Sequence, residues 1–159
     1  MKLSILIPSI PERFDKAIKL YNKCLEQATD EVEVVMLTDN KKKSIGAKRN
    51  ELISMAQGIY FTILDDDDDI TNDYVETLLP YMEDFHDVIT YKQKCFIEDY
   101  SFIVTFGMNN EIEHNTKDGR YQDCMRPPWH CCVWLRERYK IIKFPDVSYG
   151  EDGVWAYRS

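Results

Sequence analysis

The first half of the chain alternates short apolar runs with longer segments in which apolar residues recur at helical spacing. Each apolar run is rich in β-branched residues and ends at a turn-forming or polar residue, so it predicts a buried strand. The runs are Leu3–Ile7, Val32–Leu37 and Ile59–Leu64. The spacing between them predicts an amphipathic helix from Phe14 to Ala28 and a second helix from Ile45 to Ala56, closed by Gly58.

The pattern weakens in the second half. Thr71 or Asn72 is a candidate cap for a third helix, whose apolar face runs from Tyr74 to Met82. Later segments predict three short strands, a polar loop with room for a β-excursion, a buried stretch of aromatics and cysteines, a helical turn and a last helix. These segments are Val88–Lys92, Cys95–Glu98, Phe102–Phe106, Asn109–Asp123, Arg126–Trp134, Leu135–Tyr139 and Gly153–Arg158.

Alternating strands and helices predict an α/β fold with a mostly parallel central sheet, flanked by helices and joined by right-handed crossovers. The second half predicts a smaller part of mixed or antiparallel strands. Ligands of parallel sheets bind beyond the carboxyl ends of the strands. Ser9 follows the first strand, Asp39 the second, and the run Asp65–Asp69 the third. The sequence therefore predicts that these polar groups meet at one edge of the sheet and form a binding site.

Composition narrows the classes of function. The 159 residues fit one domain, and no apolar run approaches the roughly 20 residues of a transmembrane helix. Twenty Lys and Arg against 28 Asp and Glu give a net charge of −8, which argues against nucleic acid as a partner because such binding neutralises phosphates. The five cysteines form no CxxC pair. We therefore expect reduced thiols in a cytoplasmic protein, with Cys131 and Cys132 packed in the core.

The run Asp65–Asp69 is the strongest chemical signal. Its adjacent carboxylates repel one another, and a divalent cation such as Mg²⁺, Mn²⁺ or Ca²⁺ would relieve that repulsion. The structural alternative is a solvated acidic loop whose last member favours the dipole of the next helix. An EF-hand is excluded, because Ile70 occupies the place that needs glycine and the segment before Asp65 has the pattern of a strand.

Two further motifs place charge at predicted helix starts. Gly46–Asn50 brings Lys48 and Arg49 to a helix N-terminus, which suits an anion such as a diphosphate. The preceding Lys41–Lys43 is better explained as a solvated basic loop. Gly150–Asp152 opens the last helix with two carboxylates. They can simply favour the helix dipole or, beside a metal site, supply a general base.

Taken in order, these segments resemble the family 2 glycosyltransferases, which have the Rossmann-like GT-A fold. SILIPSIPERF is similar to the family's opening strand and Pro-Ser/Thr turn. GAKRNELISMAQGIYFTILDDDD is similar to its path from a basic-Arg-Asn helix start to the DxD motif, and Gly150–Asp152 resembles its ED motif. The similarity is strong over residues 1–83, weak over 84–125 and moderate over 126–159. One departure is Thr38-Asp39-Asn40-Lys41, where the family often has Asp-Asp-Gly-Ser.

The resemblance implies one domain over residues 1–159, in which residues 1–83 bind a nucleotide-sugar donor and residues 84–159 bind the acceptor and supply the base. The implied donor contacts come from Pro8, Ser9, Asp39, Arg49, Asp65 and Asp66. Within VVMLTDN, Asp39 takes the place of the family's aspartate that contacts the nucleotide base. The register of the DxD motif implies that Asp67, together with Asp65, binds Mn²⁺ or Mg²⁺.

The resemblance also implies roles in the second half. Asp152 would be the catalytic base, with Glu151 as its neighbour. Trp129 and His130 are candidates to line the sugar or acceptor pocket; the alternative is ordinary packing for Trp129 and a surface position for His130.

The function implied is that of a metal-dependent, inverting, hexosyltransferase-type enzyme. It would move a sugar from a nucleotide diphosphate, UDP in particular, to a hydroxyl of a glycan, a lipid-linked molecule or another acceptor. A nucleotide-sugar- or metal-binding module without turnover stays open, because the chain ends soon after Glu151 whereas family members continue, so the acceptor half can be truncated. A nucleotidyltransferase stays open as well, although Pro8–Pro11 stands where such an enzyme displays a glycine-rich phosphate loop.

Overall fold

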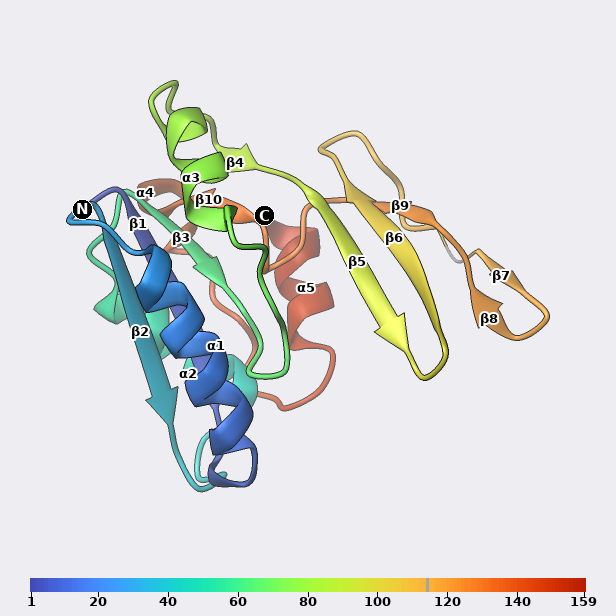
Figure 1. Cartoon of the computed structure of the whole chain (residues 1–159), viewed down its shortest axis with the longest axis horizontal. Helices are drawn as coiled ribbons and strands as arrows, with labels where there is room; N and C mark the ends of the chain where they lie inside the picture. Colours follow the sequence, from blue (N-terminus) through green and yellow to red (C-terminus); the bar gives the residue numbers. More distant parts are fainter. Residues whose placement is uncertain (114) are drawn as a thin grey trace.

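A computed structural model describes residues 1–113 and 115–159. Its main body is built on a five-stranded sheet of order β2-β1-β3-β10-β4 (Figure 1). The strands are β1 (Leu3–Ser9), β2 (Val32–Thr38), β3 (Tyr60–Ile63), β4 (Val88–Ile89) and β10 (Val133–Leu135). Strand β1 is parallel to β2 and β3, whereas β10 is antiparallel to both β3 and β4. The expected mostly parallel sheet is confirmed.

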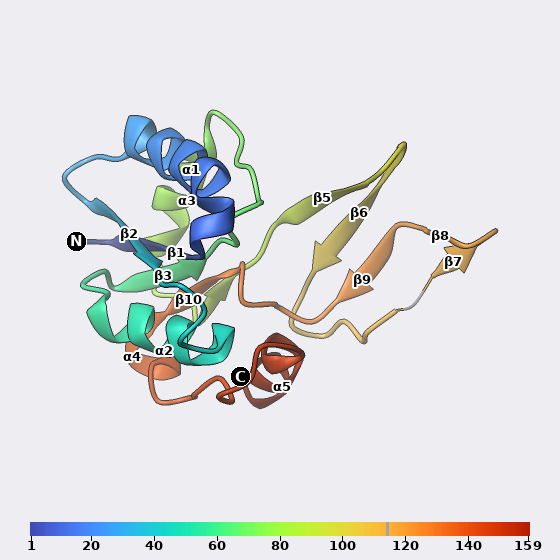
Figure 2. The same cartoon turned by 90° about the horizontal axis from the view of Figure 1, so that it is seen from below.

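Helices cover both faces of this sheet (Figure 2). Helices α1 (Phe14–Gln27) and α3 (Tyr74–Leu78) lie on one face, and α2 (Ile45–Met55) and α4 (Arg136–Tyr139) lie on the other. Two apolar cores result. Leu3, Ile5 and Ile7 pack in the core that contains residues of α1, while Leu6 packs in the core of α2. Strand β1 is therefore buried on both faces, as its continuous apolar run requires.

Gly58 brings the chain back against β1. Its backbone N–H donates to Ser4 Oγ (2.8 Å), and a Cβ added there would lie 2.6 Å from the backbone nitrogen of Ser4. The residue at the C-cap of α2 is Ala56, with φ −58° and ψ 133°. The glycine was expected as a helix terminator; the structure instead requires it for the close approach of two backbones.

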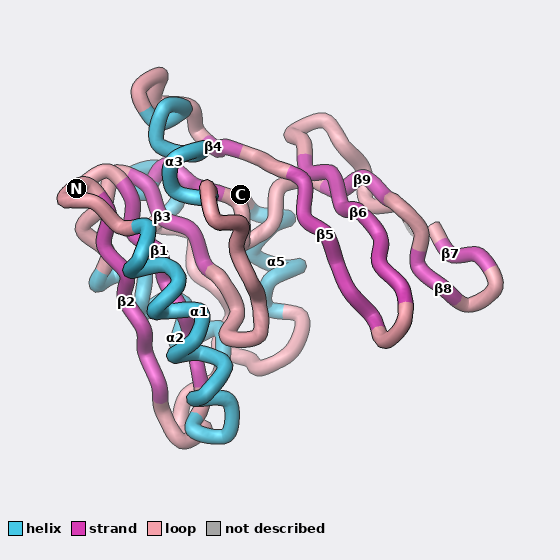
Figure 3. The backbone as a smooth tube through the Cα atoms, viewed as in Figure 1, coloured by secondary structure: helices cyan, strands magenta, loops and turns pink. Residues whose placement is uncertain are grey.

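Strands β5 to β9 form an arm that projects from the main body (Figures 1 and 2). The arm contains β5 (Lys92–Ile97), β6 (Tyr100–Phe106) and β9 (Cys124–Arg126), with β6 antiparallel to β5 and parallel to β9. A two-stranded hairpin of β7 (Thr116–Lys117) and β8 (Arg120–Tyr121) extends it. Figure 3 shows the arm as strands and loops, which confirms the mixed second half and the expected β-excursion.

Several local expectations were wrong. Asp73, not Thr71 or Asn72, occupies the N-cap position of α3, and its side chain makes no capping hydrogen bond. Val88–Lys92 is not one strand, because β4 ends at Ile89 and β5 begins at Lys92. The last helix, α5 (Glu151–Arg158), begins at Glu151 and not at Gly153.

The expectations about cysteines and membrane spans can also be compared with the structure. All five cysteines are free thiols, and Cys131 and Cys132 are buried as expected. Within the described residues, the helices are too short or too polar to cross a bilayer.

Candidate functional site

A cleft of about 680 Å³ lies at the carboxyl ends of the parallel strands. Its walls come from the end of β1, the first turn of α2, the aspartates that follow β3, and the segment that leads into α5. The expected donor and catalytic residues that line it are Pro8, Ser9, Arg49, Asp65, Asp66, Glu151 and Asp152. Residues far apart in the sequence therefore meet where the topology predicts a ligand.

The side chain of Lys48 binds residues at the ends of both β1 and β2. Its Nζ donates to the carbonyl of Ser9 (2.5 Å) and pairs with Asp39 Oδ1 (2.6 Å), and only 2 % of Lys48 is exposed. The backbone N–H of Lys43 donates to Asp39 Oδ2 (2.9 Å). The hydrogen bond from Lys48 lowers the pKa of Asp39. Both oxygens of Asp39 are thus held by the protein, a role that the sequence did not indicate; its expected contact with the nucleobase stays a prediction.

Arg49 joins three separate segments below the cleft. Its Nη1 lies 2.7 Å from Glu151 Oε1, and its Nη2 lies 2.7 Å from Asp65 Oδ1 and 3.3 Å from His130 Nε2. The ring of Phe144 lies 5.4 Å from the guanidinium carbon. Arg49 and Glu151 are both buried. They therefore form an interior ion pair between α2 and α5.

Asp65 stays ionised although it is partly buried. Burial raises its pKa, but hydrogen bonding with His130 and the charge of Arg49 outweigh that effect and hold the pKa well below its usual range. His130 Nε2 lies 3.5 Å from Asp65 Oδ2. The site therefore presents a carboxylate, and not a carboxylic acid, on the strand side of the cleft.

The remaining aspartates point in different directions. Arg13 Nη1 lies 2.9 Å from Asp66 Oδ1 and 3.3 Å from Asp67 Oδ2. Asp68 folds back, so that its Oδ2 accepts from the backbone N–H of Asp65 (3.0 Å). Asp69 pairs with Lys23 of α1 (2.7 Å), away from the cleft. The members of the run therefore have separate partners, and Asp67 and Asp69 are also exposed to solvent.

Sequence reasoning missed Arg13. The signal was present, because Pro11 starts a 3₁₀ turn over Pro11–Arg13 directly after β1, where the topology places ligand contacts. The hydrogen bond to Asp66 raises the pKa of Arg13, and Arg13 lines the cleft.

The donor set bears on the expected metal. Among the described residues, no group of three or more His, Cys, Asp or Glu side chains is arranged to hold an ion. Mg²⁺ in nucleotide sites, however, takes one or two carboxylates and completes its shell with phosphate oxygens and water. Asp67 is half exposed and Asp65 partly so. These residues fit an ion whose remaining ligands are phosphate oxygens and water.

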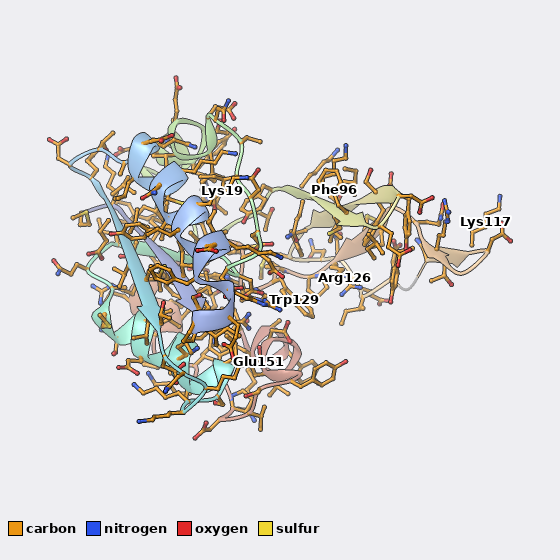
Figure 4. All side chains as sticks on the ribbon, turned by 60° about the horizontal axis from the view of Figure 1, so that its bottom comes forward. Lys19, Phe96, Lys117, Arg126, Trp129 and Glu151 are labelled. Carbon is orange, nitrogen blue, oxygen red and sulfur yellow. The ribbon has the colours of Figure 1, made fainter. Side chains whose placement is uncertain are left out.

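Asp152 faces the cleft from the first turn of α5. Trp129 Nε1 donates to its Oδ2 (3.1 Å), and His130 Nδ1 lies 3.9 Å from the same oxygen. Figure 4 shows Trp129 and Glu151 near each other where the arm meets the main body. Trp129 and His130 therefore lie beside the candidate base. The surface alternative for His130 was wrong, because only 6 % of it is exposed.

Comparisons with known proteins identify the family of the chain. The family described as glycosyl transferase family 2 matches residues 15–138. An uncharacterized glycosyltransferase of Haemophilus influenzae is 26 % identical over 138 residues, which cover 85 % of this chain and 52 % of the relative. The chain thus spans about half the length of this curated relative.

The fold is also similar to crystal structures of S. aureus TarS. TarS matches with a TM-score of 0.63 at 15 % identity, over 98 % of this chain and 33 % of TarS. The complex of TarS 1–349 with UDP matches with a TM-score of 0.64 at 14 % identity, over 98 % of this chain and 54 % of that one. The complex with UDP-GlcNAc matches with a TM-score of 0.63 at 14 % identity, over 98 % and 52 %.

Replacing Arg49 tests the interior ion pair. Arg49→Gln leaves the buried carboxylate of Glu151 without its cation, so we expect a loss of about 3–5 kcal/mol in the free energy of unfolding. Arg138→Gln is the matched control, because its ion pair with Asp87 is exposed and such pairs contribute about 0–1 kcal/mol. Urea unfolding at neutral pH measures both, and equal losses would contradict the structural role of Arg49.

Asp68 predicts a dependence of stability on pH. Burial and the nearby charge of Asp65 raise the pKa of Asp68 from 3.8 to about 6. The folded state thus holds this proton more tightly than the unfolded state. The resulting stabilisation is complete below pH 3.8 and is lost as the pH rises through about 6.

Asp68→Asn keeps the hydrogen-bond acceptor but cannot ionise. We expect it to be more stable than the wild type at pH 8 by at most about 3 kcal/mol, with the difference vanishing near pH 4. The pKa of Asp69 is lowered by its hydrogen bond with Lys23, so Asp69→Asn should show no such gain. Thermal unfolding of the variants and the wild type across this pH range tests the prediction. If the stability of Asp68→Asn and of the wild type changes with pH in parallel, the raised pKa of Asp68 is refuted.

Proposed function

Because the chain belongs to glycosyl transferase family 2 and has the GT-A fold, we propose that it is an inverting glycosyltransferase. It moves a sugar from a UDP-sugar to a hydroxyl of a glycan, a lipid-linked molecule or another acceptor. The similar TarS structures contain UDP and UDP-GlcNAc, which makes UDP-GlcNAc the first donor to test. Five free thiols agree with a reducing cytoplasm as its place of action.

One observation carries this proposal: the cleft has the ionised Asp65, together with Asp66 and Arg13, on its strand side and Asp152 on its α5 side. A donor diphosphate needs positive charge and backbone donors, and Arg13, Lys41 and Lys43 all line the cleft. An acceptor hydroxyl needs a proton acceptor on the side away from the diphosphate. Asp152 supplies that group and is partly exposed.

Asp67, together with Asp65, would hold Mn²⁺ or Mg²⁺ in this proposal. When bound, the ion neutralises negative charge on the departing diphosphate. The neighbouring residues support the arrangement: His130 and Arg49 keep Asp65 ionised, and Glu151 is paired with Arg49. We therefore assign Glu151 to positioning and keep the base role for Asp152 alone.

The reaction then proceeds by direct displacement. The acceptor oxygen attacks the anomeric carbon as Asp152 takes its proton, and the bond from that carbon to the diphosphate oxygen breaks with release of UDP. Attack from the face opposite to UDP inverts the configuration at the anomeric carbon. Atoms and charge balance, because the proton remains on Asp152 until solvent removes it.

A binding module without turnover is the second candidate, since the chain spans about half of its curated relative. Both candidates bind a UDP-sugar, and only the enzyme releases UDP from UDP-GlcNAc. Nothing in the site favours a nucleotidyltransferase, because the segment after β1 carries Pro8 and Pro11 and no glycine-rich loop.

The metal assignment predicts a difference between two neighbouring aspartates. Calorimetry should show that Mn²⁺ strengthens UDP binding to the wild type. Asp67→Asn should abolish most of this enhancement, because Asp67 is the assigned metal ligand. Asp69→Asn is the matched control and should keep the enhancement, since Asp69 pairs with Lys23 outside the cleft. Equal UDP affinity with Mn²⁺ and with excess chelator would refute the metal role, and equal effects of the two substitutions would refute the register.

The base assignment predicts a separation of rate from binding. Asp152→Asn keeps the shape of the side chain but cannot take the proton, so UDP release should slow by about 10²–10⁴-fold. UDP affinity should change little, because the donor contacts lie elsewhere. Asp99→Asn, on the arm surface in a pair with Arg120, controls for the loss of one carboxylate. Normal turnover by Asp152→Asn would remove this residue from the mechanism.

A further inference from the structure

We propose that Trp129 is a positioning residue that fixes the carboxylate of Asp152 for proton transfer. This inference rests on the proposed function, in which Asp152 is the base. It adds a role that packing alone does not give to Trp129, because the relevant atom is the indole N–H and not the ring surface.

The contact has a defined direction. An indole nitrogen can only donate, so Trp129 Nε1 gives its hydrogen to Asp152 Oδ2 at 3.1 Å. A hydrogen bond to an ionised acceptor is stronger than one between neutral groups. The other oxygen, Oδ1, accepts from the backbone N–H of Gly153 (2.7 Å). Each oxygen of the carboxylate thus has one hydrogen-bond donor, and together they fix its plane.

Asp152 has little else to hold it. Its neighbour Glu151 is buried against Arg49, but in the described part of the chain no lysine or arginine forms an ion pair with Asp152. The nearest titratable group is His130, whose Nδ1 is 3.9 Å from Oδ2. The segment before α5 is exposed from Asp146 to Gly150. Among residues 1–113 and 115–159, no side chain other than Trp129 lies within hydrogen-bond distance of this carboxylate.

Trp129 is itself held on several sides. The guanidinium of Arg126, at the end of β9, lies 5.6 Å from its ring centroid. Its backbone carbonyl accepts from Trp134 Nε1 (3.0 Å) and from the backbone N–H of Cys132 (2.9 Å). Trp129 therefore contacts three parts of the fold. Its ring lies beside Arg126 of the arm, its backbone carbonyl is bound by the segment that leads into β10, and its indole N–H donates to α5.

Rigid placement of this kind matters for rate. A base displaced by about 1 Å can slow a reaction about 10²-fold, because the proton acceptor no longer meets the attacking oxygen. Trp129→Phe removes the N–H and keeps an aromatic ring. We expect it to slow UDP release from UDP-GlcNAc about tenfold or more, with UDP affinity unchanged within about twofold.

Trp155→Phe is the matched control. Its indole N–H donates to the carbonyl of Ile142 (3.0 Å), and the residue is fully buried in α5. This substitution should lower the melting temperature, yet leave the rate per folded molecule near that of the wild type at 20 °C or below. A wild-type rate in Trp129→Phe, combined with a slow Asp152→Asn, would overturn the positioning role and leave the proposed function intact.

A second measurement does not depend on activity. The chain has three tryptophans, and an ¹H–¹⁵N spectrum resolves their indole N–H signals, which single Trp→Phe variants assign. In Asp152→Ala, the Trp129 signal should move and exchange faster with water, while those of Trp134 and Trp155 stay in place. An unmoved Trp129 signal overturns the proposal. Wild-type protein that releases no UDP overturns both this role and the proposed function, so the two failures are distinguishable.

Discussion

Two buried cations at the start of α2 constrain the whole structure. Lys48 and Arg49 are both 2 % exposed, and a charge in the interior is tolerated only when it is paired and hydrogen-bonded. Their partners come from the ends of β1, β2 and β3 and from the start of α5. The strand ends and the last helix must therefore converge on α2, which is why a cleft forms there. An alternative packing that moved α5 away would separate Glu151 from Arg49 and leave Arg49 with only Asp65 and His130 as partners.

The same constraint divides the acidic residues into groups with different roles. Asp39, Asp65 and Glu151 neutralise the two cations, and Arg13 compensates Asp66 and Asp67 from the other wall. Asp152 differs from them, because its close donors are the uncharged N–H groups of Trp129 and Gly153. A carboxylate that is restrained by uncharged donors suits the role of base that is proposed for Asp152.

The segment from Arg126 to Leu135 connects the arm, the site and the sheet. It leaves β9, passes beside α5 through Trp129 and His130, and enters the central sheet as β10 (Figures 2 and 4). His130 contacts both Arg49 and Asp65, and its carbonyl accepts from Ile63 at the end of β3 (3.3 Å). This segment of the second half thereby packs against the charged network that the first half begins, and it connects the arm to that network.

The sequence by itself determined the parallel sheet, the strand ends that carry polar residues and the kind of chemistry placed there. These features follow from local patterns. A strand that is buried on both faces appears in the sequence as a short apolar run, and an amphipathic helix appears as apolar residues at helical spacing. Only the tertiary structure decided which charges pair. The partners of Arg49 include Glu151, 102 positions later, and Asp39 is engaged by Lys48 although its motif suggested a nucleobase contact. Gly58 likewise serves the approach to Ser4, which no local rule indicates. These contacts depend on which distant segments the loops bring together. The pairing of buried charges stabilises the fold only after those segments have met.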